Sequence, residues 1–474
     1  MSDVRTQADA GDLGFLDQEA LADFVVRQRW FGSKSQEVIG AAVREALVIR
    51  SGEPLLLIAL VEIRFQPGTH DLYQLPLGVR ADRGDLDDDA VVAEGGGWVV
   101  HDALADPELA RELARLVETG TTVAEEDAAI EFCPLDAGPS ADGLGAVRPM
   151  GAEQSNTSVV FDERLVLKAY RRLEAGVNPE LELLRFLTKQ GFPNVAALSG
   201  WYAHYGRLMD VTLGTLQAFV PSERDGWSLA LDALAVGDDG LFPRLRRLGE
   251  VTGQMHSALA SDASDPAFAP EEPSTESLGI LAATIDEEIE AVFASLPEDP
   301  AVESIARRGE EVRDRLRLLA GIGDAGRIIR HHGDYHLGQA LWTGADWMVI
   351  DFEGEPARSL AERRRKRSPL RDVAGMLRSF AYAASVAAMD GTDEEAAIAW
   401  EARARDEFLD GYLPAADAAT ILPSGRGSFD KLLALFELEK AVYELRYELD
   451  HRPDWVRVPV AGILRLLRSE QEVA

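Results

Sequence analysis

The chain has 474 residues, of which 46% are hydrophobic, so it can bury a sizeable core in about two to four domains. Its 48 lysines and arginines face 82 aspartates and glutamates, and the formal net charge of −34 disfavours nucleic acid and anionic membranes as partners. One cysteine, Cys133, excludes an intrachain disulfide and a multi-cysteine metal site. Because the sequence has no long apolar run and no basic start followed by an apolar stretch, we expect a cytoplasmic protein without a membrane segment.

Residues 1–125 are predicted to form a small α/β domain. An amphipathic pattern favours a helix over residues 18–29. Four runs of aliphatic and β-branched residues follow, separated by polar turns, and these runs predict strands. They are residues 44–52, 53–65, 71–80 and 97–104.

Residues 126–222 have a sheet-rich pattern, and residues 223–474 a helical one. In the first part, strands are expected near 147–151, 158–171, 199–212 and 214–221, with a helix over 179–189. In the second part, six segments have apolar residues at helical spacing: 241–260, 275–293, 301–319, 372–389, 394–412 and 429–451. A short strand and loop region at 327–351 interrupts them. The sequence therefore predicts an α+β protein in which a sheet-rich small lobe precedes a helical large lobe.

That strand and loop region contains "HHGDYHLGQALW", followed by "WMVIDFEGEP". Short apolar runs around the turn "TGAD" predict a loop, a β-hairpin and a strand that ends in acid. Asp334 and Gln339 then belong to the loop, while Asp351 and Glu353 follow the last strand. Phosphoryl transfer uses such a set, because an aspartate orients and deprotonates the hydroxyl nucleophile while amide and carboxylate oxygens bind Mg²⁺.

A structural turn is the alternative interpretation of this motif, since aspartates in turns often accept backbone hydrogen bonds. The spacing of Asp334, Gln339 and the acid after the hairpin favours catalysis. Several histidines surround the aspartate and suggest a metal site. We nevertheless expect His332 and His336 to support the loop, with Asp334 as the base.

The pattern His332-Gly333-Asp334-x₄-Gln339 resembles the catalytic loop of aminoglycoside phosphotransferases and choline kinases, and Asp351 matches their metal-binding acid. Gln339 stands where most of those relatives have asparagine. Four longer stretches are similar to actinobacterial maltokinases: "RWFGSKSQ", "IDFEGEP", "RSPLRDVAGMLRSF" and "ELEKAVYELRYELDHRPDWVRVP". The resemblance spans nearly the whole chain.

This resemblance implies a bilobal protein-kinase-like fold with an N-terminal cap at 1–125, a small lobe at 126–222 and a large lobe at 223–474. It also implies ATP and Mg²⁺ as cofactors, and the phosphorylation of maltose to maltose 1-phosphate on the way to glycogen or α-glucan. Close relatives phosphorylate glucosamine instead. A trehalose synthase-type enzyme is the partner that such a pathway implies, and the oligomeric state, monomer or dimer, stays open.

In a kinase of this type, the small lobe supplies a strand lysine for the ATP phosphates and a helix acid that orients the lysine. Lys168 in "LVLKAYR" and Glu180 in the next helix fit these roles, with Glu182 in reserve. The preceding "GAEQSNTSVVF" is expected to form a turn that covers the phosphates, with Gln154, Ser155, Asn156, Thr157 and Ser158 as donors. Backbone groups near Gln217 and Phe219 are expected to contact adenine.

The C-terminal helical segment is rich in tyrosine and glutamate along one stripe. From the pattern alone, a surface helix with weak ion pairs is the simpler interpretation. The resemblance to maltokinases reverses that preference and implies sugar contacts from this helix. Together with Asp334 and His336, the expected substrate residues are Tyr443, Glu444, Tyr447 and Glu448.

Two other functions stay open. A kinase for glucosamine or an aminoglycoside would favour a more acidic pocket, which the Glu-rich C-terminal segment does not exclude. A pseudokinase that acts as a binding or scaffold protein is disfavoured by the intact set of Lys168, Asp334 and Asp351. Nearby, the basic run "RRRKR" at 363–367 is interpreted as a solvated loop, and Arg371-Asp372 as an ion pair that ties the catalytic loop.

Overall fold

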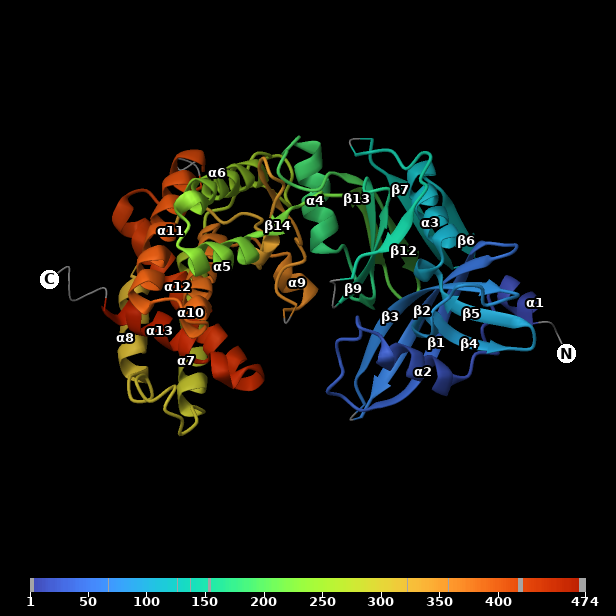
Figure 1. Ribbon diagram of the computed structural model, residues 1–474, viewed down its shortest axis with the longest axis horizontal. Coiled ribbons are helices and arrows are strands. Elements are labelled where there is room, and N and C mark those ends of the chain that lie inside the picture. The colour runs from blue at the N-terminus through green and yellow to red at the C-terminus, as the bar shows by residue number, and fades with distance from the viewer. Residues whose placement is uncertain are drawn as a thin grey trace. The chain divides into compact units, whose positions relative to one another are not determined.

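The computed structural model describes residues 4–66, 68–125, 127–136, 138–151, 155–321, 323–356, 358–416 and 421–468. The chain divides into two compact units (Figure 1). The first consists of Met1–Lys189 and Ala196–Pro221, and the second of Gln190–Val195 and Ser222–Ala474. Because the first is rich in strands and the second in helices, the predicted α+β class is confirmed.

An antiparallel sheet forms the N-terminal part of the first unit, with strand order β1-β2-β3-β5-β4 and β11 paired with β3. Its strands are β1 (Val38–Arg50), β2 (Leu55–Phe65), β3 (His70–Arg80), β4 (Val91–Gly95), β5 (Trp98–Asp102) and β11 (Arg172–Leu173). Two helices precede this sheet, α1 (Val4–Asp9) and α2 (Gln18–Arg27). The predicted helix and strands of this domain are present.

The continuous apolar run of β2 serves two hydrophobic cores. Because successive side chains of a strand point to opposite faces, Leu55, Leu57 and the other odd-numbered residues pack with α2. The even-numbered Leu56, Ile58 and Leu60 pack on the other face, in a second core shared with the rest of the unit. Burial on both faces explains why β2 has no polar alternation.

Helix α3 (Pro107–Thr119) lies in this domain and was not predicted. Its signals are nevertheless present in the sequence. Asp106 is the N-cap and accepts a hydrogen bond from the Glu108 N–H at 2.8 Å, Pro107 occupies the first turn, and Gly120 ends the helix at φ 68°. The buried face of α3, which includes Leu109 and Leu113, completes the second core.

A seven-stranded antiparallel sheet completes the first unit, in the order β6-β7-β12-β13-β10-β9-β8. Its strands are β6 (Thr122–Glu125), β7 (Ala128–Pro134), β8 (Val147–Pro149), β9 (Asn156–Phe161), β10 (Leu165–Tyr170), β12 (Leu198–Gly206) and β13 (Val211–Ala218). Helix α4 (Pro179–Lys189) has the predicted bounds. Buried residues of this sheet, such as Phe132 and Leu167, belong to the same core as α3 and the even-numbered face of β2.

Arg171 connects the two sheets of the first unit. It is fully buried, forms an ion pair with Asp102 and donates from Nε to the Thr157 hydroxyl at 2.8 Å. Its guanidinium also lies 5.0 Å from the ring centroid of Trp30. Nearby, the side-chain amide of Gln74 donates to the Tyr170 carbonyl at 2.8 Å. These polar contacts and the β3–β11 pairing join the N-terminal domain to the second sheet.

Helices dominate the second unit. They are α5 (Gly226–Val236), α6 (Phe242–Leu259), α7 (Thr275–Ala294), α8 (Gly309–Ala320), α9 (Leu360–Arg363), α10 (Leu370–Met389), α11 (Glu394–Ala415), α12 (Arg426–His451) and α13 (Arg457–Arg468). A small sheet pairs β14 (Arg224–Asp225), β15 (Ala340–Trp342) and β16 (Trp347–Val349), and its β15–β16 hairpin matches the prediction.

Several details of the prediction for the second unit were wrong. Helix α8 begins at Gly309 rather than 301, because Val302 and Ile305 lie in consecutive turns closed by i to i−3 hydrogen bonds, and such turns give apolar residues the same spacing as a helix. Helices α5, α9 and α13 and strand β14 were not predicted as separate elements. Strand β14 has two residues and α9 has four, so their local patterns are weak, whereas α13 has an amphipathic pattern that could have been recognised.

Glycines allow α6 and α11 to approach each other closely. A side-chain carbon at Gly249 would overlap the Phe408 carbonyl oxygen, and one at Gly411 would overlap the Arg246 carbonyl oxygen. Glycine is therefore required at both contacts. The close packing positions His256, near the end of α6, against the loop described below.

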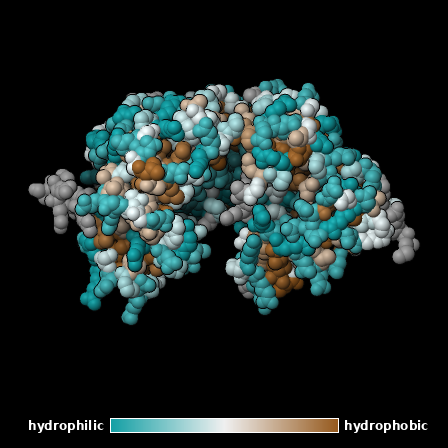
Figure 2. Space-filling model, in the orientation of Figure 1, coloured by the Kyte–Doolittle hydropathy of each residue, from teal (hydrophilic) through white to brown (hydrophobic). Residues whose placement is uncertain are grey.

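On the face shown in Figure 2, hydrophilic side chains dominate, and hydrophobic ones form small, separated patches. This distribution agrees with a chain in which 27% of residues are charged. Among the described residues, every helix is too short or too polar to span a lipid bilayer.

Candidate active site

Asp372, at the start of α10, holds the loop that carries Asp334. Its carboxylate accepts hydrogen bonds from the backbone N–H of His332 at 2.8 Å and of Gly333 at 3.0 Å. His256 Nε2 lies 3.1 Å from the same carboxylate. Burial acts to raise the pKa of Asp372, but the surrounding histidines outweigh it and hold the pKa well below its usual range. A buried carboxylate therefore holds the loop in place, and His256 in turn contacts that carboxylate.

His332 connects the loop to the strand that leads to Asp351. Its Nε2 lies 2.9 Å from the Ile350 carbonyl oxygen, and its Nδ1 accepts the Asp334 N–H at 3.3 Å. Both contacts are satisfied by a neutral ring protonated at Nε2. In these contacts, His332 supports the backbone on either side of the site.

Gln339 and Asp351 bring an amide and a carboxylate together. The Gln339 Nε2 donates to Asp351 Oδ2 at 2.9 Å, and Asp351 has a positive φ of 64°, an uncommon conformation for a residue other than glycine. Among the described residues, no three His, Cys, Asp or Glu side chains cluster as a metal-binding group. A sparse set of hard oxygen donors suits Mg²⁺, which takes few protein ligands and keeps phosphate or water oxygens. The residues present therefore fit this ion.

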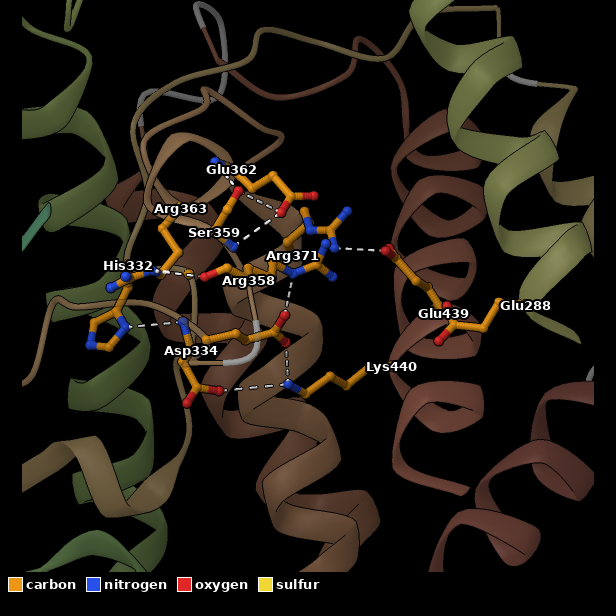
Figure 3. Close-up of polar contacts among 12 residues, drawn as sticks. Glu288, His332, Asp334, Arg358, Ser359, Glu362, Arg363, Arg371, Glu439 and Lys440 are labelled. Atoms are coloured by element: carbon orange, nitrogen blue, oxygen red, sulfur yellow. Dashed lines mark hydrogen bonds and ion pairs between the residues drawn. The ribbon is translucent and has the colours of Figure 1, made fainter. Parts of the chain in front are cut away.

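Lys440, on α12, lies beside Asp334 (Figure 3). Its Nζ is 3.6 Å from Asp334 Oδ1 and 2.8 Å from Glu355 Oε1, and Glu355 also pairs with Arg358. Burial acts to raise the pKa of Glu355, but Lys440 and Arg358 outweigh it and lower the pKa to about 2. In Lys440, burial is likewise outweighed, and the two carboxylates raise its pKa. The base candidate thus has a fixed cation as its neighbour.

Two cavities meet at Asp334 and Lys440. The larger has a volume of about 400 Å³, within the size range of small-molecule sites. Its lining includes the aromatic residues Trp227, Tyr335, Tyr382 and Trp455, together with the polar His336, Glu444 and Arg452. Burial lowers the pKa of His336. The smaller cavity, of about 60 Å³, is lined by Tyr443 and by several charged side chains around Glu355.

The predicted sugar residues on α12 do not all line the same cavity. Glu444 lines the larger cavity and Tyr443 the smaller one. Tyr447 is 40% exposed and lines neither cavity. Its ring stacks on that of His451, with the two ring centroids 4.4 Å apart. Glu448 is buried, accepts a hydrogen bond from the Tyr382 hydroxyl at 3.1 Å and pairs with Arg452 at 2.7 Å. Glu448 therefore reaches the larger cavity only through residues that line it.

In the first unit, Lys168 on β10 pairs with Glu180 on α4 at 2.8 Å. Both side chains are buried, and the Tyr170 hydroxyl donates to the same Glu180 oxygen at 2.8 Å. The Glu180 N–H donates to the Asn178 side chain at 2.8 Å, which fixes the start of the helix. The lysine and the acid expected from the sequence are thus joined.

The predicted phosphate-covering turn differs in extent. Gln154 lies outside the described residues. Ser155 is exposed just before β9, whereas Asn156, Thr157 and Ser158 belong to β9 itself, so placing these three in the turn was wrong. The turn signal is carried by the residues before them, and the β-branched and polar residues from 156 onward pair with β10.

Gln217 lies near the end of β13, and Phe219 follows that strand. The Gln217 backbone pairs with Val166 and Leu198 in the sheet. The Phe219 N–H donates to the Arg164 carbonyl at 2.8 Å. Part of the backbone expected to meet adenine is therefore engaged within the sheet.

The basic run at 363–367 is built into the fold, which corrects its interpretation as a solvated loop. Arg363 donates to the Glu353 carbonyl at 3.1 Å, and Lys366 Nζ to the Pro266 and Ala269 carbonyls at 2.7 Å each. Asp372 ties the catalytic loop as expected, but it does so by accepting hydrogen bonds from backbone N–H groups rather than through an ion pair with Arg371. Arg371 pairs with Glu439 at 2.7 Å.

Residues 146–419 match the family described as "Phosphotransferase enzyme family". The chain belongs to this phosphotransferase family. Its reaction is the ATP-dependent transfer of a phosphoryl group to an alcohol group. Residues 24–106 of the phosphotransferase match the "Maltokinase N-terminal cap domain", which confirms the predicted cap and kinase-like architecture.

Two similar curated proteins are named glucosamine kinase. That of Streptacidiphilus jiangxiensis is 29% identical over 453 residues, 90% of this chain and 97% of the relative. That of Mycolicibacterium smegmatis (strain ATCC 700084 / mc(2)155) is 31% identical over 336 residues, 68% of this chain and 79% of the relative. A solved glucosamine kinase in complex with glucosamine, ADP and inorganic phosphate has a TM-score of 0.70 at 22% identity, covering 94% of the phosphotransferase and 99% of that chain. At that identity, the structural match shows the fold.

Sequence reasoning did not assign site roles to several residues that the fold of this phosphotransferase gathers around Asp334. Glu355 and Lys440 had a weak signal, since Glu355 follows Glu353 by two positions and Lys440 lies one helical turn before Glu444. Trp227 and Trp455 had none, because these two side chains line one cavity although they lie 228 positions apart in the sequence.

Proposed function

We propose that this phosphotransferase transfers phosphate from ATP to a sugar hydroxyl, and that its acceptor is maltose, giving maltose 1-phosphate. The observation that carries the proposal is the larger cavity, which begins at Asp334 and is lined by Trp227, Tyr382 and Trp455. Aromatic faces pack against the CH faces of a sugar ring, and polar side chains between them bind its hydroxyl groups.

In the proposed mechanism, Asp334 accepts the proton of the acceptor hydroxyl and orients its oxygen towards the γ-phosphate. Gln339 and Asp351 would hold Mg²⁺, with Glu353 near a second ion. Bound there, Mg²⁺ supplies neutralisation of the charge on the phosphate oxygens. Lys168, oriented by Glu180, would bind the phosphates of ATP.

The remaining assignments complete the ATP and sugar sites. Gln154, Ser155, Asn156, Thr157 and Ser158 would contact the phosphates, and backbone groups near Gln217 and Phe219 would contact adenine. His336 and Glu444 would bind sugar hydroxyls, with Tyr443 next to them. Residues 1–125 would form the cap, 126–222 the small lobe and 223–474 the large lobe. Association with a trehalose synthase-type enzyme stays a prediction from the resemblance to maltokinases.

Glucosamine is the second candidate acceptor. The observation that favours it is the name of the two curated relatives, which match 68–90% of the chain. The scaffold hypothesis has less support, because the Lys168–Glu180 pair and the loop around Asp334 are intact.

The test is a panel of sugars with ATP and Mg²⁺, followed by identification of the phosphorylated carbon. The panel contains maltose, glucose, glucosamine and an aminoglycoside, and kcat/KM is measured for each. We expect maltose to give the highest value and a phosphate on its reducing carbon. If glucosamine exceeds maltose by about tenfold, which is about 1.4 kcal/mol of transition-state discrimination, the maltose assignment is wrong. Absence of phosphorylation on every sugar would favour the scaffold hypothesis.

A further inference from the structure

Each carboxylate that lines the larger cavity already faces a cation. Asp334 lies 3.6 Å from Lys440 Nζ. Glu444 Oε2 accepts hydrogen bonds from Arg378 Nε at 3.0 Å and from Arg378 Nη2 at 2.7 Å. A further cation, Arg452, also lines this cavity. Among the described lining residues, both acids therefore have a cation within 4 Å.

Lys440 is the cation nearest to the base, and its position is fixed. Glu355 holds its ammonium group at 2.8 Å, and Arg358 in turn pairs with Glu355. The ammonium also lies 5.1 Å from the ring centroid of Tyr443. With side chains exposed by only 25% in Lys440 and 11% in Glu355, this pair is screened by water less than a surface pair would be.

Any reacting hydroxyl must come close to this fixed charge. A hydroxyl that gives its proton to Asp334 lies within about 3 Å of the carboxylate. Since Asp334 Oδ1 is 3.6 Å from Lys440 Nζ, a reacting oxygen that bonds to Oδ1 lies at most about 7 Å from the ammonium. An amino group on the same sugar ring falls within the range over which two partly buried charges repel each other.

We propose that Lys440 is a specificity-determining residue, which selects against acceptor sugars that carry a protonated amine and so favours neutral sugars. This inference rests on the proposed function, in which Asp334 acts on a sugar hydroxyl. The inference defines the substrate class of that site as sugars without a positive charge. Lys440 discriminates through its charge rather than its shape, because Glu355 holds it in place whether or not a sugar is present.

The experiment compares two sugars that differ at one carbon, glucosamine with its ammonium group and glucose with a hydroxyl. The ratio of kcat/KM for glucosamine to that for glucose is measured in the wild type and in Lys440→Gln, Lys440→Arg and Lys431→Gln. Lys431 is an exposed lysine of the same helix and serves as the matched control. Dissociation constants of both sugars, from calorimetry on the full chain, provide a second readout that needs no turnover.

We expect Lys440→Gln to raise the glucosamine-to-glucose ratio by about tenfold, the scale of one screened charge pair. Lys440→Arg and Lys431→Gln should leave the ratio as it is in the wild type. An unchanged ratio of both kcat/KM and affinity in Lys440→Gln would overturn the proposal, and so would an equal shift in Lys440→Arg. The wild-type ratio tests the proposed function independently, because a preference for glucosamine in the wild type refutes the neutral acceptor whatever the variants do.

Discussion

Asp372 accepts a hydrogen bond from the backbone N–H of His332 at 2.8 Å, and this contact fixes the loop two residues before the base. The second oxygen of the same carboxylate accepts the Gly333 N–H at 3.0 Å. Gly333 has φ 90°, which suits glycine, so both N–H groups can turn towards one carboxylate. Asp334 is therefore positioned from outside its own loop, by the start of α10.

Replacing Asp372 with Asn should disturb this support. An amide offers one oxygen and one NH₂ group, so one of the two backbone N–H donors would face another donor inside the protein. We expect a loss of about 3 kcal/mol in unfolding free energy and a fall in kcat, measured by thermal unfolding and steady-state kinetics. Asp390→Asn, at the exposed end of the same helix, is the control. Unchanged stability in Asp372→Asn would show that these bonds do not hold the loop.

Replacing Asp334 with Asn should separate binding from turnover. The side chain keeps its size but loses the proton acceptor, so kcat should fall by about 10²–10⁴-fold. The affinity for ATP with Mg²⁺, measured by calorimetry, should stay within about twofold of the wild type, since other groups bind the nucleotide. Turnover at the wild-type rate in this variant would refute the assigned base.

Replacing Lys168 with Met should damage both stability and the use of ATP. Removal of one partner leaves Glu180 buried without its cation, which costs about 3–5 kcal/mol. The loss of a phosphate contact should reduce kcat/KM for ATP on the order of 10²-fold. Tyr170→Phe is the matched control, because it removes a neutral hydrogen bond to Glu180 and keeps the charge of Lys168. If Tyr170→Phe and Lys168→Met have equal effects on kcat/KM, the charge of Lys168 is not used.

The stabilisation from Glu355 should depend on pH. Its pKa is lowered from 4.5 to about 2 in the folded chain, so its ionised form stabilises the fold above about pH 4.5, and this contribution is lost as the pH falls towards 2. The wild type should exceed Glu355→Gln in stability by at most about 3 kcal/mol at neutral pH. The difference between their unfolding midpoints should shrink at about pH 3. A difference that is constant with pH would contradict the pairing with Lys440 and Arg358.

The comparison of sequence and structure shows what a local pattern can predict. Asp334, Gln339 and Asp351 lie within 18 residues, and a loop, a hairpin and a strand bring them together through short-range geometry alone. The Lys168–Glu180 pair was likewise expected, because one strand and the next helix carry it. When functional residues lie on neighbouring elements of the chain, the local sequence pattern is enough to predict that they come together.

The environment of Asp334 could not be predicted in the same way. Helical spacing puts Lys440, Glu444 and Tyr447 near one stripe of α12, but it does not say which elements that stripe meets. In the structure, Lys440 and Glu444 line a cavity, whereas Tyr447 is 40% exposed and outside its lining. Only tertiary packing decides this, as it decides that Trp227 and Trp455 line the same wall.

The β3–β11 pairing and the buried Arg171–Asp102 contact have a consequence for how the protein can be divided. Deleting the first 120 residues would remove the partner strand of β11, leave Arg171 without its acid, and uncover the hydrophobic residues that now pack against β2 and α3. A shortened enzyme would then expose an unpaired strand edge and a hydrophobic surface to solvent, and both promote aggregation. The N-terminal domain and the sheet that follows it therefore have to stay together in any expressed or engineered form of the protein.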